Sequence, residues 1–153
     1  LWAAQKAGLT SHVTLADRST QLPYIRRNVG LNEKNLLTDV DVRPVLWGDV
    51  EAARVLRVDT VFASDLVYKE SAYVKLVSTL EALQPRLVIL AFACRDPPSE
   101  RRLLRLLMPA FILELKQCVK AADDEKYDIN IWACHHRNRR KEDRLFTKIQ
   151  SPL

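Results

Sequence analysis

The chain has 153 residues, of which 48% are hydrophobic and 28% are charged, and its formal net charge is +5. This composition is typical of a single globular domain that buries one hydrophobic core. Because no apolar run approaches the roughly 20 residues that span a bilayer, and the first residues lack the layout of a signal peptide, we expect no membrane contact and a cytoplasmic or nuclear location.

Strand-like and helix-like segments alternate along the chain with short connections, which is the pattern of βαβ units around a parallel sheet. The first half predicts a strand over 12–17, a helix over 19–32 and a strand over 39–47. Leu22, Ile25 and Val29 share one face of that helix, and Pro44 places the second strand at a sheet edge.

The second half begins with a predicted buried strand over 58–64. The next helix has a continuous apolar stripe made of Tyr73, Leu76, Val77, Leu80 and Leu83. It is followed by a strand over 86–94 that is apolar on both faces, as a central parallel strand should be, and by a helix that enters through Ser99 and ends at Met108.

The last two predicted strands, 111–119 and 127–134, are separated only by the polar stretch KAADDEK. With no helix between them, they should form an antiparallel hairpin added to the parallel sheet. The predicted fold class is therefore α/β, with a mostly parallel sheet that ends in an antiparallel hairpin.

The basic charge is concentrated in HHRNRRKEDR, residues 135–144. We expect residues 1–134 to form the domain and 135–153 to form a basic, solvated tail; a localisation signal and a contact with an acidic partner are the alternatives. Because no zinc-finger spacing, RNA-binding signature or phosphate loop accompanies this charge, we do not expect a nucleic-acid partner.

Cysteine and histidine residues give no sign of a metal site. Cys94, Cys118 and Cys134 are widely spaced in apolar segments without a CxxC pair, so we expect reduced core residues. The three histidines, His12, His135 and His136, form no metal-ligand constellation with acids or cysteines, and no metal is expected.

The stretch VFASDLVY, residues 61–68, ends an apolar run abruptly at Ser64 and Asp65. Ligands bind at the carboxyl ends of parallel strands in open α/β sheets, which favours a chemical role for this carboxylate. A cap for the following helix is the alternative, and these residues alone leave both explanations open.

Six motifs together resemble a known family: VTLADR, RRNVGLN, VLWGD, ASDLVY, LAFACR and YDINIWACHHRNRRKED. Their order and spacing resemble the C-terminal four-fifths of a seven-strand, class I S-adenosylmethionine-dependent methyltransferase. More narrowly, they resemble the methyltransferase-like protein-lysine methyltransferases. The resemblance implies a Rossmann-like sheet, S-adenosyl-L-methionine as cofactor, a protein substrate of the chaperone or translation-factor type, and a monomer.

The resemblance also implies roles for particular residues. Asp17 would accept hydrogen bonds from the ribose hydroxyls of the cofactor, Trp47 would pack on its adenine, and Ser64 would lie beneath it. Asp65 and Tyr68 would be the catalytic, substrate-positioning residues: lysine has a pKa of about 10.4, so the site must orient the amine and favour its neutral form. The alternatives are a helix cap at Asp17 and a buried core tryptophan at Trp47.

The sequence departs from the family at its beginning, because the first strand and the glycine-rich loop of the family should precede Leu1. Three explanations remain open: an incomplete form of an enzyme, a non-catalytic relative that binds a partner, or direct pairing of strands 12–17 and 58–64 in a smaller sheet. We favour the first, because the remaining positions at the ligand edge carry residues suited to the chemistry. The predicted function is protein-lysine N-methylation; a non-catalytic binding module is the alternative.

Overall fold

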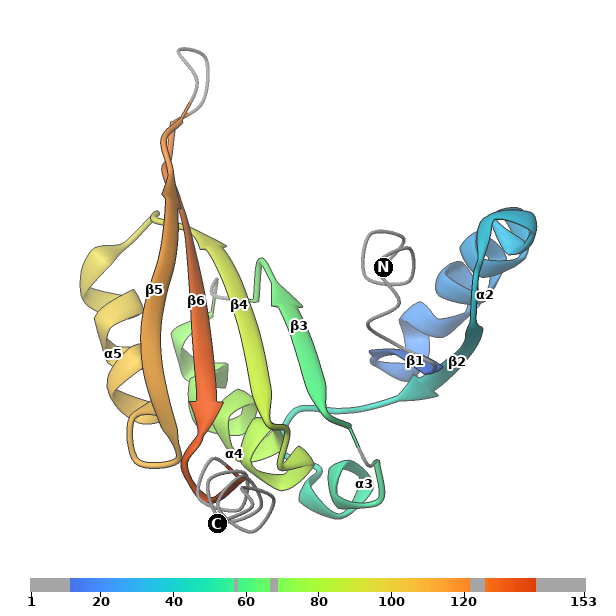
Figure 1. Cartoon of the computed structure of the whole chain (residues 1–153), viewed down its shortest axis with the longest axis horizontal. Coiled ribbons are helices and arrows are strands. Elements are labelled where there is room, and N and C mark those ends of the chain that lie inside the picture. Colours follow the sequence, from blue (N-terminus) through green and yellow to red (C-terminus); the bar gives the residue numbers. More distant parts are fainter. Residues whose placement is uncertain (1–11, 57, 67–68, 122–125, 140–153) are drawn as a thin grey trace, which may run out of the picture. The chain divides into compact units, whose positions relative to one another are not determined.

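The computed structural model describes residues 12–56, 58–66, 69–121 and 126–139 (Figure 1). The chain divides into two compact units, Leu1–Leu46 and Trp47–Leu153, and each is described by itself. Within the described ranges, no helix has the length and apolar character needed to cross a membrane.

The first unit is a βαβ arrangement. Its strands β1 (His12–Asp17) and β2 (Asp39–Pro44) pair in parallel along their whole length. The crossover contains η1 (Ser19–Gln21), α2 (Leu22–Leu31) and η2 (Glu33–Asn35), where η denotes a 3₁₀ helix. Pro23 is tolerated because the first turn of a helix has N–H groups without intrahelical partners. The predicted strand 12–17 and the helix after it are confirmed.

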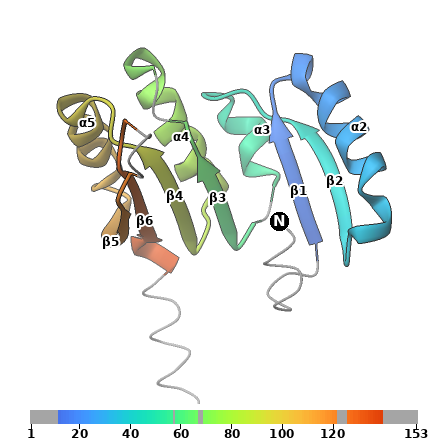
Figure 2. The same cartoon turned by 90° about the horizontal axis from the view of Figure 1, so that it is seen from above.

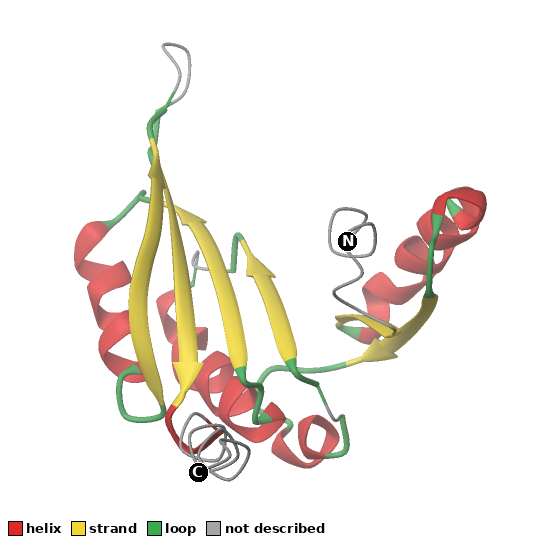
Figure 3. Ribbon diagram, viewed as in Figure 1, coloured by secondary structure: helices red, strands yellow, loops and turns green. Residues whose placement is uncertain are grey.

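The second unit contains a four-stranded sheet with the strand order β3-β4-β6-β5. Its elements are, in chain order, α3 (Val50–Arg54), β3 (Thr60–Ser64), η3 (Glu70–Ala72), α4 (Tyr73–Leu83), β4 (Leu87–Ala93), α5 (Pro97–Leu107), β5 (Phe111–Val119) and β6 (Ile129–His136). β3 and β4 are parallel, whereas β6 is antiparallel to both of its neighbours. The predicted hairpin is therefore confirmed, and its second strand lies inside the sheet (Figure 3).

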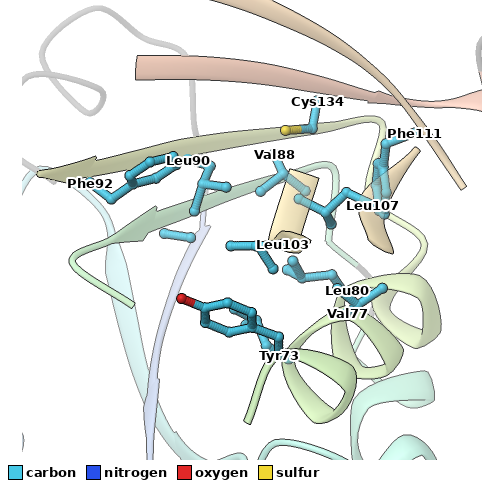
Figure 4. Packing of buried hydrophobic residues seen from close by; sticks show 12 residues of the cluster. Tyr73, Val77, Leu80, Val88, Leu90, Phe92, Leu103, Leu107, Phe111 and Cys134 are labelled. Atoms are coloured by element: carbon cyan, nitrogen blue, oxygen red, sulfur yellow. The ribbon is translucent and has the colours of Figure 1, made fainter. Parts of the chain in front are cut away.

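The core of the second unit lies between this sheet and the helices α4 and α5, which cover the same side of it (Figure 2). β4 contributes Val88, Leu90 and Phe92, each at most 2% exposed, and the predicted stripe of α4 packs against them (Figure 4). Complete burial of each such side chain stabilises the fold by roughly 1.5–3 kcal/mol. This packing fixes the carboxyl ends of β3 and β4 relative to the helices that follow them.

The prediction that β3 is a buried strand is wrong. Only Ala63 of this strand is buried, and Phe62 is 70% exposed. The cause is the position of β3 at one edge of the four-stranded sheet, together with the location of α4 and α5 on a single side of it. Sequence hydrophobicity reports the character of a side chain but not whether an element covers it.

Several boundaries also differ from the prediction. β2 ends at Pro44, so Trp47 lies beyond the strand rather than within it. α5 begins at Pro97, two residues before the predicted start, because prolines fit the first turn of a helix. β6 continues to His136, and most of the predicted basic tail lies outside the described residues.

The three thiols are free, but they do not share one environment. Cys134 is buried as predicted, Cys94 is half-buried, and Cys118 is exposed, so the expectation that all three are core residues is wrong. Cys118 lies on β5 at the edge of the sheet, where a strand has only one neighbour.

β1 and β3 belong to different sheets. The explanation in which these two strands pair directly in one smaller sheet is therefore not realised among the described residues.

Candidate functional site

A charged pair joins the carboxyl ends of β3 and β4. Asp65 follows β3 directly, and Arg95 lies two residues after β4. Oδ1 of Asp65 is 3.3 Å from Nη2 of Arg95, and the two side chains are 65% and 49% exposed, respectively. The pair therefore faces solvent at the edge where ligands bind in open parallel sheets.

The backbone of Asp65 is held in an unusual conformation. Its φ is 53°, in the left-handed region that costs most L-residues roughly 1–2 kcal/mol. Its N–H donates to the carbonyl oxygen of Ala91 on β4 at 2.9 Å, which fixes the turn. The capping alternative does not hold, because the next helical turn starts at Glu70 and its N-cap is Lys69. Aspartate is one of the few L-residues that adopt this region often, so the turn holds the carboxylate at the end of β3 without requiring glycine.

Ser64 is the last residue of β3, opposite Ala91, and it is exposed beside Asp65. The structure therefore brings Ser64, Asp65 and Arg95 together at one edge. Tyr68, the second predicted substrate-positioning residue, lies outside the described residues. Arg95, from the connection after β4, is the partner of Asp65 in this pair.

Trp47 begins the second unit and is half-buried against its hydrophobic core. The next residue, Gly48, has a φ of 92°, a conformation that L side chains rarely adopt. Its N–H donates to Oγ1 of Thr79 at 2.8 Å, and the same hydroxyl donates to the carbonyl oxygen of Lys75. Thr79 thus anchors the Trp47–Gly48 turn on α4, and Trp47 combines core packing with a partly accessible indole.

Asp17 ends β1 in the first unit, and its side chain is 47% exposed. Its Oδ1 accepts from the backbone N–H of Arg18 at 2.6 Å, and no described residue bonds to Oδ2. The N-cap of η1 is Arg18, without a side-chain cap, so Asp17 does not cap the helix as the alternative required. An exposed carboxylate with one free oxygen at a strand end fits an acceptor for ribose hydroxyls.

A polar chain between Glu70, Tyr73, Ser99 and Arg102 links the residues after β3 to α5. Sequence reasoning missed it, because its members are about 30 positions apart and no motif contains them. Metal chemistry has no candidate within the described ranges, where no three His, Cys, Asp or Glu side chains form a possible metal site.

Comparison with solved structures defines the class of fold. A predicted O-methyltransferase from Agrobacterium tumefaciens matches with a TM-score of 0.59 at 16% identity, covering 82% of this chain and 62% of that one. A tRNA (uracil-54, C5)-methyltransferase from Pyrococcus abyssi, in complex with S-adenosyl-L-homocysteine, matches with a TM-score of 0.50 at 18% identity, covering 80% of this chain and 28% of that one. The fold is that of the S-adenosylmethionine-dependent methyltransferases.

Comparison of sequences defines the family. The chain belongs to the lysine methyltransferase family, which it matches over residues 1–109. Mouse protein N-lysine methyltransferase METTL21A is 25% identical over 137 residues, which cover 88% of this chain and 61% of the mouse protein. The chain therefore spans about three fifths of the length of this curated relative. The cofactor of this class of enzyme is S-adenosylmethionine.

Proposed function

We propose that the protein transfers a methyl group from S-adenosylmethionine to a lysine side chain of another protein. The observation that carries this proposal is the exposed carboxylate of Asp65, held at the carboxyl end of β3 in a left-handed turn and beside Arg95. Membership of the lysine methyltransferase family and the similarity to mouse protein N-lysine methyltransferase METTL21A support the choice of a lysine acceptor.

The chemistry requires an amine that is correctly oriented and neutral. When bound, S-adenosylmethionine would supply an electrophilic methyl group on its sulfonium; the amine nitrogen would take this group, the sulfur would leave as the thioether S-adenosylhomocysteine, and the amine would give up one proton. Asp65 accepts a hydrogen bond from the incoming ammonium and orients its nitrogen, so that the transfer geometry is set before the proton leaves. Release of this proton to solvent completes the balance without a nucleophilic side chain on the protein.

Three described residues carry groups suited to separate parts of the cofactor. Asp17 would accept from the ribose hydroxyls through its free Oδ2, and the indole of Trp47 would pack against adenine. Ser64, exposed at the end of β3, would contact the cofactor from the residue before Asp65. We further propose a protein substrate of the chaperone or translation-factor type and a monomeric enzyme.

The test measures cofactor binding and methyl transfer separately. S-adenosylmethionine binding is measured by calorimetry, and transfer of a radiolabelled methyl group is measured on lysine-containing proteins of a cell extract. Because the chain spans 61% of the mouse relative, both the 153-residue chain and the longest form encoded by its gene are assayed. We expect Asp65→Asn to abolish transfer and to leave cofactor binding unchanged.

The matched control is Asp96→Asn, which removes an exposed carboxylate from the neighbouring connection after β4. This variant should retain both binding and transfer. Full transfer by Asp65→Asn would contradict the proposed role of Asp65. Cofactor binding without lysine methylation in any form would instead favour the binding-module alternative.

A further inference from the structure

The connection between β3 and α4 carries Asp65. One of its ends contacts the connection after β4, and the other end contacts α5. At its beginning, Asp65 contacts Arg95 in the connection after β4. At its end, Glu70 contacts two residues of α5, the helix that continues from the same connection. Two charged contacts therefore bracket the segment that contains the proposed lysine site.

The contact at the end of the connection is made by both carboxylate oxygens of Glu70. Oε1 accepts from Nη1 of Arg102 in an ion pair, and Oε2 accepts from Oγ of Ser99 at 3.3 Å. Engagement of both oxygens fixes the rotation of the carboxylate as well as its position. Charge-assisted hydrogen bonds of this kind are roughly twice as strong as neutral ones.

The contact is also anchored in the core. Oγ of Ser99 lies 3.1 Å from the hydroxyl of Tyr73, which is the first residue of α4 and only 2% exposed. Since the single hydroxyl proton of Ser99 is directed at Glu70, the hydroxyl of Tyr73 is the donor to Ser99. The hydrogen bonds run from Tyr73 to Ser99 and from Ser99 to Glu70. Because this series ends on the charged carboxylate of Glu70, each hydrogen bond polarises the next.

We propose that Glu70 and Arg102 are positioning residues that set the placement of Asp65 for methyl transfer. They act through the connection between β3 and α4, whose far end they fix to α5, and they touch neither substrate nor cofactor. This inference rests on the proposed function for its catalytic part. Its structural part, a clamp on the connection, stands independently of the reaction.

Loss of the ion pair between Glu70 and Arg102 should affect the rate of methyl transfer more than the stability of the fold. Glu70 and Arg102 are 43% and 68% exposed, and exposed ion pairs contribute little to folding because water and salt screen them. A small displacement of a reacting group, by contrast, lowers a rate by up to about 100-fold. Removal of the clamp should therefore change turnover far more than it changes the melting temperature.

The experiment compares Glu70→Ala, Arg102→Ala and the charge-exchanged double variant Glu70→Arg with Arg102→Glu. We expect each alanine variant to lower kcat at least about tenfold and to change KM for S-adenosylmethionine by less than about twofold. Amide hydrogen exchange should become faster at Asp65 and Ala72, whose N–H groups donate to the carbonyl oxygens of Ala91 and Lys69, but not at core residues of β4. The double variant restores the ion pair but not the hydrogen bond from Ser99, because arginine has no acceptor, so it should recover part of the rate and of the protection.

The control is Arg101→Ala, which removes the adjacent exposed arginine of α5 that no described residue pairs with. It should change neither rate nor exchange. Unchanged exchange in Glu70→Ala would overturn the clamp, and faster exchange with an unchanged kcat would overturn the positioning role. Loss of exchange protection throughout β4 would show that Glu70 stabilises the whole fold, and this result would also overturn the positioning role. If the wild type methylates no lysine, the proposed function fails, and the exchange measurements still decide whether the clamp exists.

Discussion

Asp65 and Arg95 form an ion pair across the carboxyl ends of two adjacent parallel strands, while the backbone of Asp65 lies in the left-handed region. A protein selected for stability alone would place glycine at such a position, because glycine adopts this conformation without steric cost. Aspartate tolerates this region better than most L-residues, so the conformation is compatible with the fold, and the chemical role proposed above for the exposed carboxylate is what substitution can test.

Replacement of Asp65 by glycine should separate stability from function. Glycine adopts the left-handed region more easily than aspartate, which favours the folded state. Loss of an exposed ion pair and the flexibility of glycine in the unfolded chain oppose this gain, and each of these two effects is about 1 kcal/mol or less. We expect Asp65→Gly to change the free energy of unfolding by less than about 1 kcal/mol and to abolish methyl transfer. Urea unfolding and the transfer assay measure the two effects.

Gln84 offers a matched control for this substitution, because it also has a positive φ, 46°, and caps the C-terminus of α4 away from the pair. Glycine is the preferred residue at such caps. Gln84→Gly should raise the free energy of unfolding by about 1 kcal/mol and leave transfer unchanged. A large destabilisation by Asp65→Gly alone would mean that the carboxylate is retained for the fold.

Thr79→Val should destabilise the second unit. Valine has nearly the same shape, but it offers no acceptor to the N–H of Gly48, which Oγ1 of Thr79 accepts at 2.8 Å. We expect a loss of about 1 kcal/mol in urea unfolding, the usual net value of one hydrogen bond. Ser78→Ala, the control, removes an exposed hydroxyl that bonds only to the carbonyl of Lys75 on its own helix, and it should have little effect.

The three thiols should differ in their reaction with an alkylating reagent at pH 8. Burial raises the pKa of Cys134 to about 12, so almost none of it is the reactive thiolate. The pKa of Cys94 is also raised, mainly by burial and further by the charge of Glu100, whereas Cys118 is exposed. Cys118→Ser should remove the fast labelling phase seen by mass spectrometry, and Cys134→Ser should not. Rapid labelling of Cys134 in the folded protein would contradict the buried position of this thiol.

Acid should weaken the contact of Asp128, which precedes β6, with Lys120 and Ala121, which follow β5. A hydrogen bond from the Lys120 ammonium, followed by one from the N–H of Ala121, lowers the pKa of Asp128 below its usual value. Such a group contributes stability above the unfolded pKa of about 3.9 and loses it as the pH falls through the lower folded value. The melting temperatures of the wild type and Asp128→Asn should therefore differ at pH 6 and converge as the pH falls below the unfolded pKa of about 3.9 and through the lower folded value. Parallel curves over this range would exclude the linkage.

The sequence predicts those parts of the fold that local patterns determine. The stripe of α4 and the hairpin of β5 and β6 follow from hydrophobic periodicity and loop length, and both are confirmed. The sequence indicates a central parallel strand after α4, but β4 is parallel only to β3 and pairs with β6 in antiparallel orientation. The exposure of Phe62 and of Cys118 could not be predicted, because it depends on which sheet edge a strand occupies and on which side the helices lie.

The candidate site also has features that the sequence predicts and features that it does not predict. The position of Asp65 after a strand was readable from the abrupt end of an apolar run, and the family resemblance indicated its role. Its positive φ and the contact of Glu70 with Ser99 and Arg102 were not readable, because a tertiary contact between exposed polar residues has no signature in a single sequence.

The strand order has a consequence for synthesis on the ribosome. β6 follows β5 in the chain, but it lies between β4 and β5 in the sheet. A nascent chain that has released β3, β4 and β5 cannot yet close this sheet, and its unpaired strand edges stay open to other nascent chains until residue 136 has emerged. Translational pausing before Ile129 should therefore increase the dependence of this protein on chaperones that bind nascent chains.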